Sequence, residues 1–308
     1  MWRAGLRRGA VRHRRVAADR PRHDAEVSTS KTTIHERSRA MGRVQGKVAF
    51  ITGAARGQGR SHAVRLAEEG ADIIAVDACQ DFDTVGYAMA TEADLADTVK
   101  AVEALDRRIV AVKADVRDAA ALKAAVDEGV AQLGRLDIVS ANAGICTVQK
   151  WDEVTPQIWA DTLDVNLTGV WHTCVATIPH LLTAGGGSII ITSSTSGIKG
   201  QPWLAPYVAA KHGIVGVMRS LANELAEHNI RVNTIHPAGV DTPLVAGLGG
   251  MNQFIEQSPT MGPIFMNTMP VEVVDPVDIS NAVLYLASDE ARYVTGLEMK
   301  VDAGCTIR

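Results

Sequence analysis

A tyrosine and a lysine four residues apart are the groups in this chain whose types and spacing best suit chemistry. Tyr207 and Lys211 lie in residues 206–213, whose pattern predicts a helix, and side chains four apart project from one helix face. A phenol with a pKa of about 10 is a poor base at neutral pH, and a nearby ammonium favours the phenolate. Tyr207 is therefore a candidate acid–base residue and Lys211 its activator. Without context, such a pair is usually a surface aromatic and a solvated charge.

A glycine-rich turn is the second chemical signal. The residues between an aliphatic run and a helical pattern are Thr52-Gly53-Ala54-Ala55-Arg56-Gly57-Gln58-Gly59. Glycines there let the backbone approach a pyrophosphate, whose charge the N–H groups and dipole of the following helix stabilise. Asp77, 18 residues after Gly59, can accept hydrogen bonds from ribose hydroxyls and would repel a 2′-phosphate. We therefore expect NAD rather than NADP, although Arg56 could hold that phosphate or be a solvated loop charge.

These groups need a scaffold to position them. From residue 47 onward, short aliphatic runs alternate with helical stretches; the runs are 48–51, 73–76, 109–112, 138–139, 189–191 and 232–235. Runs that are apolar on both faces and separated by helices indicate βαβ crossovers. We predict an α/β fold with a single doubly wound Rossmann domain and a parallel sheet. Two stretches exceed this alternation, and we interpret 78–107 as an insertion after the second strand and 243–270 as an apolar lid after the sixth.

Together these motifs resemble the short-chain dehydrogenase/reductase family, whose glycine turn is T-G-x-x-x-G-x-G, and the resemblance covers residues 46–308. It implies that Asp115 and Val116 contact adenine, and that residues 141–144 correspond to the N-N-A-G element with Ala141 replacing the first Asn. It also implies that Val240 and Thr242 face the carboxamide and pyrophosphate, in a P-G-x-V-x-T-like segment with Ala238 inserted. The predicted cofactor residues are Gly53, Ala55, Arg56, Gly57, Gln58, Gly59, Asp77, Asp115, Val116, Asn142, Ala143, Gly144, Tyr207, Lys211, Pro237, Val240 and Thr242.

The same resemblance assigns the remaining catalytic roles. Ser194, 13 residues before Tyr207, matches the hydroxyl that hydrogen-bonds the substrate oxygen. Asn166 matches the residue that holds a water against the lysine, and Lys211 also holds the nicotinamide ribose. For alcohol oxidation we expect Tyr207 to take the hydroxyl proton while hydride leaves for the nicotinamide, with Ser194 stabilising the charge on oxygen.

Residues 53–62 and 87–95 further resemble the mycofactocin-associated, carveol dehydrogenase-like subgroup. This resemblance implies that the insertion covers the cofactor, that NAD stays bound through turnover, and that a separate redox carrier reoxidises it. The alternative is that the insertion is a helical surface decoration.

The lid segment points to a hydrophobic substrate. Its apolar residues, broken by glycines and prolines, are Leu248, Met251, Phe254, Ile255, Met261, Ile264, Phe265, Met266 and Met269. Methionines adapt to irregular apolar shapes, so we expect a secondary alcohol or ketone such as a terpenoid or steroid; packing against a neighbouring subunit is nearly as good an explanation. Trp203 lies between Ser194 and Tyr207 and could line the pocket. His236 could be an acid or base, but a lone histidine at a strand end is more often structural.

Charge and composition restrict the remaining possibilities. The net charge of −4 combines +7 in residues 1–40 with −11 in residues 41–308. We interpret residues 1–40 as a disordered basic arm or a mis-called start, with translation beginning at Met41 and one domain from 41 to 308; nucleic-acid binding through this arm is less favoured. The four cysteines show no C-x-x-C spacing, so we expect no metal site and a cytoplasmic protein. No run approaches the roughly eighteen apolar residues of a membrane span.

Two functional alternatives stay open at this point. The protein could be an ordinary short-chain dehydrogenase with freely exchanging NAD(P), or a redox sensor that binds NAD without turnover. Residues 275–304 resemble the last helix and edge strand through which family members associate, so a homotetramer is expected, with a dimer as the alternative.

Overall fold

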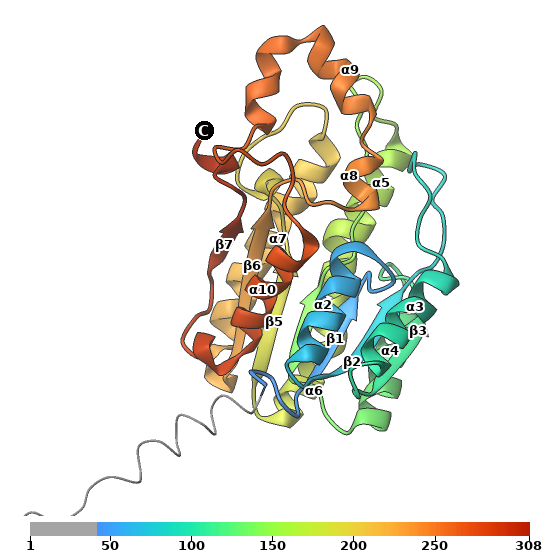
Figure 1. Ribbon diagram of the computed structural model, residues 1–308, viewed down its shortest axis with the longest axis vertical. Helices are drawn as coiled ribbons and strands as arrows, with labels where there is room; N and C mark the ends of the chain where they lie inside the picture. Colours follow the sequence, from blue (N-terminus) through green and yellow to red (C-terminus); the bar gives the residue numbers. More distant parts are fainter. Residues whose placement is uncertain (1–41) are drawn as a thin grey trace, which may run out of the picture. The chain divides into compact units, whose positions relative to one another are not determined.

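A seven-stranded sheet, with every pairing parallel, organises residues 42–308, the part of the chain that the computed structural model describes (Figure 1). The strands are β1 (Val48–Thr52), β2 (Asp72–Asp77), β3 (Ile109–Lys113), β4 (Ile138–Ala141), β5 (Gly187–Thr192), β6 (Ile230–Pro237) and β7 (Glu298–Val301), in the order β3-β2-β1-β4-β5-β6-β7. The predicted strands and doubly wound fold are confirmed. The strand order reverses between β1 and β4, where such folds bind ligands. The predicted arm of residues 1–40 lies outside the described residues.

Helices bury both faces of the sheet. On one face, α2 (Gly57–Glu68), α3 (Glu92–Glu103) and α10 (Pro276–Ala287) share a core with Ile51 and Ile73. On the other, α4 (Ala119–Leu133), α6 (Gly169–Ala184) and α7 (Ala205–Glu224) share a core with Phe50 and Ile74. Neighbouring strand residues thus enter opposite cores, which explains why the strands are continuous aliphatic runs. The remaining helical segments are α5 (Pro156–Leu163), the π-helix η1 (Asp164–Thr168), and the 3-10 turns η2 (Thr195–Gly197), η3 (Ala226–His228), η5 (Asp289–Ala291) and η6 (Cys305–Ile307).

The insertion after β2 is shorter than the sequence indicated. Residues 92–103 form α3, which is the ordinary crossover helix between β2 and β3, so only the loop 78–91 is additional. A capping box starts this helix: the amide of Asp94 donates to the hydroxyl of Thr91 at 3.2 Å, and the amide of Thr91 donates to the carboxylate of Asp94 at 2.8 Å. This T-x-x-D pattern satisfies the first orphan N–H groups of the helix, and it marks the helix start that the interpretation of 78–107 as one insertion overlooked.

A lid follows β6, consisting of α8 (Pro243–Ala246), α9 (Gly250–Gln257) and the 3-10 segment η4 (Pro259–Phe265). Figure 1 shows α8 and α9 beyond the carboxyl ends of the strands. The far end of the lid is fastened to the C-terminal segment, because the amides of Thr268 and Met269 both donate to the carbonyl of Ala303, at 2.9 and 3.0 Å. The lid is therefore connected to β6 at one end and hydrogen-bonded to the C-terminal segment at the other.

Residues 42–308 contain neither a candidate membrane-spanning helix nor a candidate metal cluster. None of their helices is long and apolar enough to cross a membrane. None of their histidines, cysteines and acidic residues gather in a group of three or more that could hold a metal ion.

Acid should destabilise this fold through His62. The imidazole is fully buried on α2 with Nδ1 2.8 Å from the Ser280 hydroxyl, and burial lowers the pKa of His62 from 6.5 to about 3. Between these values only the unfolded chain binds the proton, so the free energy of unfolding falls as the pH drops below about 6.5. Between about pH 7.5 and about pH 4.5, wild type should lose roughly 3 kcal/mol more than His62→Asn in urea unfolding. Equal losses in the two proteins would contradict this role.

Candidate active site

One cavity of about 610 Å³ at the carboxyl ends of the strands contains residues from both chemical signals. The predicted residues that line it are Gly53, Arg56, Gly57, Gln58, Asp77, Asp115, Val116, Asn142, Ala143, Gly144, Ser194, Tyr207, Lys211, Pro237, Val240 and Thr242. Four predicted residues, Ala55, Gly59, Asn166 and Trp203, are not part of its lining. The sheet thus brings groups from six connections to a single space.

The glycine turn has the geometry that a pyrophosphate needs. Gly53 adopts a φ of +67°, and a Cβ on Gly59 would lie 2.0 Å from the carbonyl oxygen of Gly53, so both positions require glycine. No side chain caps the first turn of α2, and the buried amide oxygen of Gln58 has no hydrogen-bond partner among residues 42–308. Free N–H groups at a helix start fit a bound dinucleotide phosphate, whereas the Gln58 oxygen, which can only accept, fits a donor group of a ligand.

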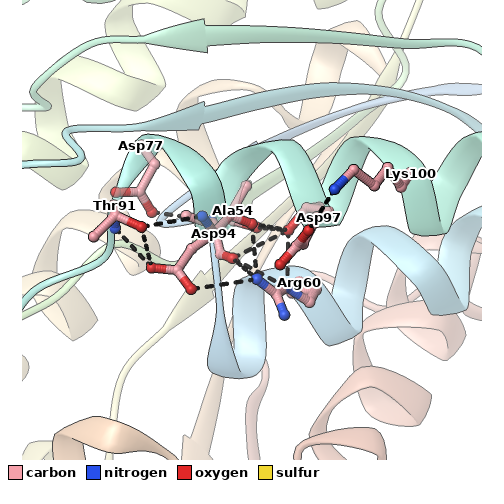
Figure 2. A network of polar contacts seen from close by, with 9 residues as sticks. Ala54, Arg60, Asp77, Thr91, Asp94, Asp97 and Lys100 are labelled. Atoms are coloured by element: carbon pink, nitrogen blue, oxygen red, sulfur yellow. Dashed lines mark hydrogen bonds and ion pairs between the residues drawn. The ribbon is translucent and has the colours of Figure 1, made fainter.

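A polar network that the sequence did not reveal holds this turn (Figure 2). The guanidinium of Arg60 donates to the carbonyl of Ala55 at 2.6 Å and to that of Asp94 at 2.7 Å. The hydroxyl of Thr98, on α3, lies 3.0 Å from the carbonyl of Ala54 and 3.1 Å from that of Ala55. With their carbonyls engaged on this side, the residues of the turn are kept in one conformation by α3. Partners 38 residues apart, such as Arg60 and Thr98, leave no local sequence signal.

Asp77 is fixed at the end of β2 as expected for a ribose acceptor. Its two carboxylate oxygens accept hydrogen bonds from the amides of Ala55 and Cys79, both at 3.0 Å. Arg56, which could have held a 2′-phosphate, instead donates to the carbonyl of Ala88 in the loop 78–91 at 2.6 Å. A negative charge therefore lines this part of the cavity, while the guanidinium of Arg56 is engaged with the insertion. This arrangement favours NAD over NADP.

Tyr207 and Lys211 lie together in the wall of the cavity, where Lys211 is buried and Tyr207 is partly buried. The side-chain nitrogen of Lys211 lies 5.4 Å from the ring centroid of Tyr207 and donates to the carbonyl of Thr192 at 2.7 Å. Burial lowers the pKa of Lys211 from 10.5 to about 8. Burial also raises the pKa of Tyr207 above its ordinary value, whereas a hydrogen bond with Ser194 lowers it. Desolvation therefore opposes the phenolate form of Tyr207. Positive charge close to the ring, such as that of Lys211, is needed to offset this cost.

Asn166 acts from behind the cavity, within the π-helix η1. Its amide nitrogen donates to the carbonyls of Ile145 and Thr162, both at 2.9 Å, and its amide oxygen accepts from the amide of Ile145 at 3.2 Å. The side chain is therefore occupied with fixing the loop after β4. The water-holding role of Asn166 stays a prediction. A Cβ on Gly144 would lie 2.8 Å from the amide oxygen of Asn166, which explains the glycine there.

The other predicted cofactor residues join strand ends to one another. Thr52 at the end of β1 accepts from the amides of Asn142 and Ala143 at 3.0 and 3.1 Å. Thr242 lies against the glycine turn, since a Cβ on Gly57 would be 3.2 Å from its methyl group. Despite the inserted Ala238, the segment after β6 therefore reaches the cavity where the resemblance placed it.

Trp203 supports the lid. Its ring stacks on Phe265 at 5.9 Å between centroids and contacts Phe254 at 5.5 Å, and of these only Phe265 lines the cavity. The lid methionines fall into two groups. Met251 lines the cavity, whereas Met261, Met266 and Met269 do not and are 43, 48 and 60% exposed. The argument for an apolar substrate therefore does not rest on these three methionines.

His236 holds the backbone of Ser194. One ring nitrogen, Nδ1, lies 2.8 Å from the carbonyl of Ser194, and Nε2 lies 2.9 Å from the hydroxyl of Thr234. Because a carbonyl can only accept, Nδ1 carries the proton and Nε2 accepts from Thr234. Burial lowers the pKa of His236, which keeps this neutral form. On the other side, the Ser194 hydroxyl oxygen accepts from the amide of Ser196 at 3.1 Å, so Ser194 is fixed from two directions.

Known proteins share this arrangement. A family model described as enoyl-(acyl carrier protein) reductase matches residues 53–306. The (-)-trans-carveol dehydrogenase of Rhodococcus erythropolis is 50% identical over 277 residues, covering 87% of this chain and 100% of the relative. Carveol dehydrogenase from Mycobacterium avium, solved in complex with NAD, is 52% identical with a TM-score of 0.81; the match covers 87% of this chain and all of the other. A short chain dehydrogenase from Mycobacterium paratuberculosis bound to NAD is 48% identical with a TM-score of 0.84 over the same shares.

The chain belongs to the short-chain dehydrogenase/reductase family. At the level of enzyme class, the prediction of an NAD-dependent alcohol dehydrogenase of the short-chain type is confirmed.

Substitutions of His236 test whether its hydrogen bond orients Ser194 or whether the ring only fills space. Asparagine can place a donor near Nδ1, glutamine only near Nε2, and leucine places none. We expect His236→Gln and His236→Leu to lose about tenfold in kcat while NAD affinity is kept, and His236→Asn to retain most of kcat, because one hydrogen bond orients Ser194. Steady-state kinetics and NAD titration measure both. Equal losses in the asparagine and leucine variants would mean that His236 only fills space.

Proposed function

We propose that this protein oxidises hydrophobic secondary alcohols to ketones, or the reverse, with an NAD that remains bound through turnover. The observation that carries the proposal is that the proton-transfer groups Ser194, Tyr207 and Lys211 line the same cavity as the glycine turn and Asp77. A hydride acceptor and a proton acceptor must both reach one carbinol, and a shared cavity satisfies that requirement.

The chain's own residues handle the proton in this scheme. The hydroxyl of Ser194 donates to the substrate oxygen, and Tyr207 takes the alcohol proton as the C–H bond breaks. Lys211, held by the carbonyl of Thr192, places its charge beside the tyrosine ring. When bound, NAD would supply the hydride acceptor and a positively charged ring. Lys211 lowers the cost of a phenolate at Tyr207, and the charge of that ring would add to its effect.

The substrate side of the cavity is mostly apolar, which supports a hydrophobic alcohol such as a terpenoid or steroid. The apolar side chains that line it from the lid and neighbouring loops are Ile145, Leu204, Leu244, Val245, Leu248, Met251, Ile255 and Phe265. Burying such a surface against an apolar skeleton is favourable, at roughly 25 cal/mol per Å². The curated relative's substrate, carveol, is of this kind.

Retention of NAD is supported by the loop 78–91, which lies across the cofactor part of the cavity through Phe82, Tyr87, Met89 and Ala90. Tyr87 connects the two sides: its hydroxyl accepts from the amide of Cys146 at 3.3 Å, and a Cβ on Gly247 would lie 2.3 Å from its ring. The insertion therefore meets the lid directly, and NAD could leave only after these contacts break.

Further anchors fix the same loop to other elements. The hydroxyl of Thr84 donates to Asp161 on α5 at 2.8 Å, and the guanidinium of Arg117 lies 4.3 Å from the centre of the Phe82 ring.

An enzyme that keeps NAD needs a separate redox carrier to reoxidise it, and we include such a carrier in the proposal.

We also propose a homotetramer. Trp171, Val175 and Leu182 lie on one face of α6 and are 46, 49 and 42% exposed, and Trp159 on α5 is 44% exposed. Large apolar side chains that gather on exposed helices commonly mark subunit contacts.

The catalytic assignment is tested with protein purified without added cofactor. Adding carveol together with a dye acceptor should bleach the dye catalytically, and Tyr207→Phe should lower kcat by about 10²- to 10⁴-fold because the proton acceptor is removed. Tyr293→Phe, an exposed tyrosine outside the cavity, is the control. Unchanged turnover in Tyr207→Phe would refute the proton-transfer role.

Retention of NAD depends on Tyr87 in this scheme. Wild type should contain NAD after gel filtration, and Tyr87→Ala should release it at least tenfold faster, because the contacts to Cys146 and Gly247 are lost. Nucleotide extraction and stopped-flow displacement measure occupancy and rate, with Tyr293→Ala as the matched control. An empty wild type that turns over added NAD would instead identify an ordinary exchanging dehydrogenase.

A further inference from the structure

A polar strip interrupts the apolar wall of the cavity beside the reacting group. It consists of Ser194, Ser196 and Gln201, all of which line the cavity. The amide of Ser196 donates to the hydroxyl of Ser194 at 3.1 Å, and the hydroxyl of Ser196 donates to the side-chain oxygen of Gln201. The strip therefore runs from the hydroxyl that faces the reacting oxygen to a carboxamide further along the wall.

This hydrogen bond orients the carboxamide of Gln201. Because its oxygen is engaged by Ser196, which is 1% exposed, the free group of the side chain is the Nε2 amide with two donor hydrogens. Within residues 42–308 no protein group accepts a hydrogen bond from Nε2, although Gln201 itself is only partly exposed. A half-buried donor in a cavity otherwise suited to apolar groups favours a ligand that brings an acceptor.

The loop that carries Gln201 belongs to the substrate side. Trp203 in residues 198–204 stacks on Phe265 of the lid, and the ammonium of Lys199 donates to the carbonyl of Ile264 at 2.6 Å. These contacts join the loop to the lid rather than to the glycine turn. Leu204, from the same loop, lines the cavity beside lid residue Ile255.

We propose that Gln201 is a second polar anchor for the substrate, donating through Nε2 to an oxygen remote from the reacting carbinol. The preferred substrates are then hydrophobic secondary alcohols, or their ketones, that carry a further hydrogen-bond acceptor such as an ether, carbonyl or hydroxyl oxygen. This inference rests on the proposed alcohol dehydrogenase function and specifies its substrate class.

A pair of nearly isosteric probes tests the anchor on the NAD-loaded protein, with the dye acceptor present to reoxidise the cofactor. trans-4-Methoxycyclohexanol has an acceptor oxygen where trans-4-ethylcyclohexanol has a methylene group. Wild type should favour the methoxy compound in kcat/KM, and Gln201→Leu should lower the methoxy-to-ethyl ratio by about tenfold through loss of one hydrogen bond. Gln149→Leu is the matched control, because Gln149 also accepts from a hydroxyl, that of Thr147 at 2.9 Å, yet does not line the cavity.

Calorimetry of the corresponding ketones binding to the NAD-loaded protein tests the anchor independently of turnover. A ketone and NAD are both oxidised, so they do not react with each other. The same tenfold loss is expected in Gln201→Leu. An unchanged ratio, or a loss of NAD from this variant, would overturn the anchor. If the ketones bind with a Gln201-dependent ratio but neither alcohol is oxidised, the proposed function fails while the anchor stands.

Discussion

In this sheet the strand order reverses between β1 and β4, so the chain segments that leave the two strands turn in opposite directions and leave a crevice beyond their carboxyl ends. The rest of the site depends on this constraint. The start of α2 faces the crevice with uncapped N–H groups, Asp77 ends β2 beside it, and β5 presents Thr192 and Ser194. A phosphate site and a proton-transfer site therefore share one cavity without any long-range motion.

Desolvation controls the chemistry of that cavity. Burial raises the pKa of Tyr207 and lowers the pKa of Lys211 to about 8, so charge on either group is costly until opposite charges are in place. Each group is accordingly fixed by the backbone: Lys211 by the carbonyl of Thr192, and Ser194 by His236 and the amide of Ser196. Fixed dipoles that need no rearrangement during reaction are what makes such a site effective.

The loop 78–91 and the lid close the crevice from two sides and meet at Tyr87 and Gly247. A cover that keeps water out of such a site strengthens the electrostatic interactions inside. It also links cofactor retention to substrate binding, because Trp203 and Lys199 join the lid to the loop of Gln201. In the proposed function, substrate selection and NAD retention share one cover, although separate residues carry them.

The sequence by itself determined the sheet and the family, because hydrophobic runs and glycine spacing are local patterns that backbone geometry dictates, and through the resemblance it supplied the candidate catalytic residues. It misjudged residues 78–107, although the T-x-x-D capping box at Thr91 marks the start of α3. Tertiary structure alone decided which side chains hold the site. Arg60 and Thr98, His236 and Ser194, and Tyr87 and Gly247 are 38, 42 and 160 residues apart in sequence. Their contacts arise when separate βα connections converge on one crevice, and no periodicity encodes that convergence.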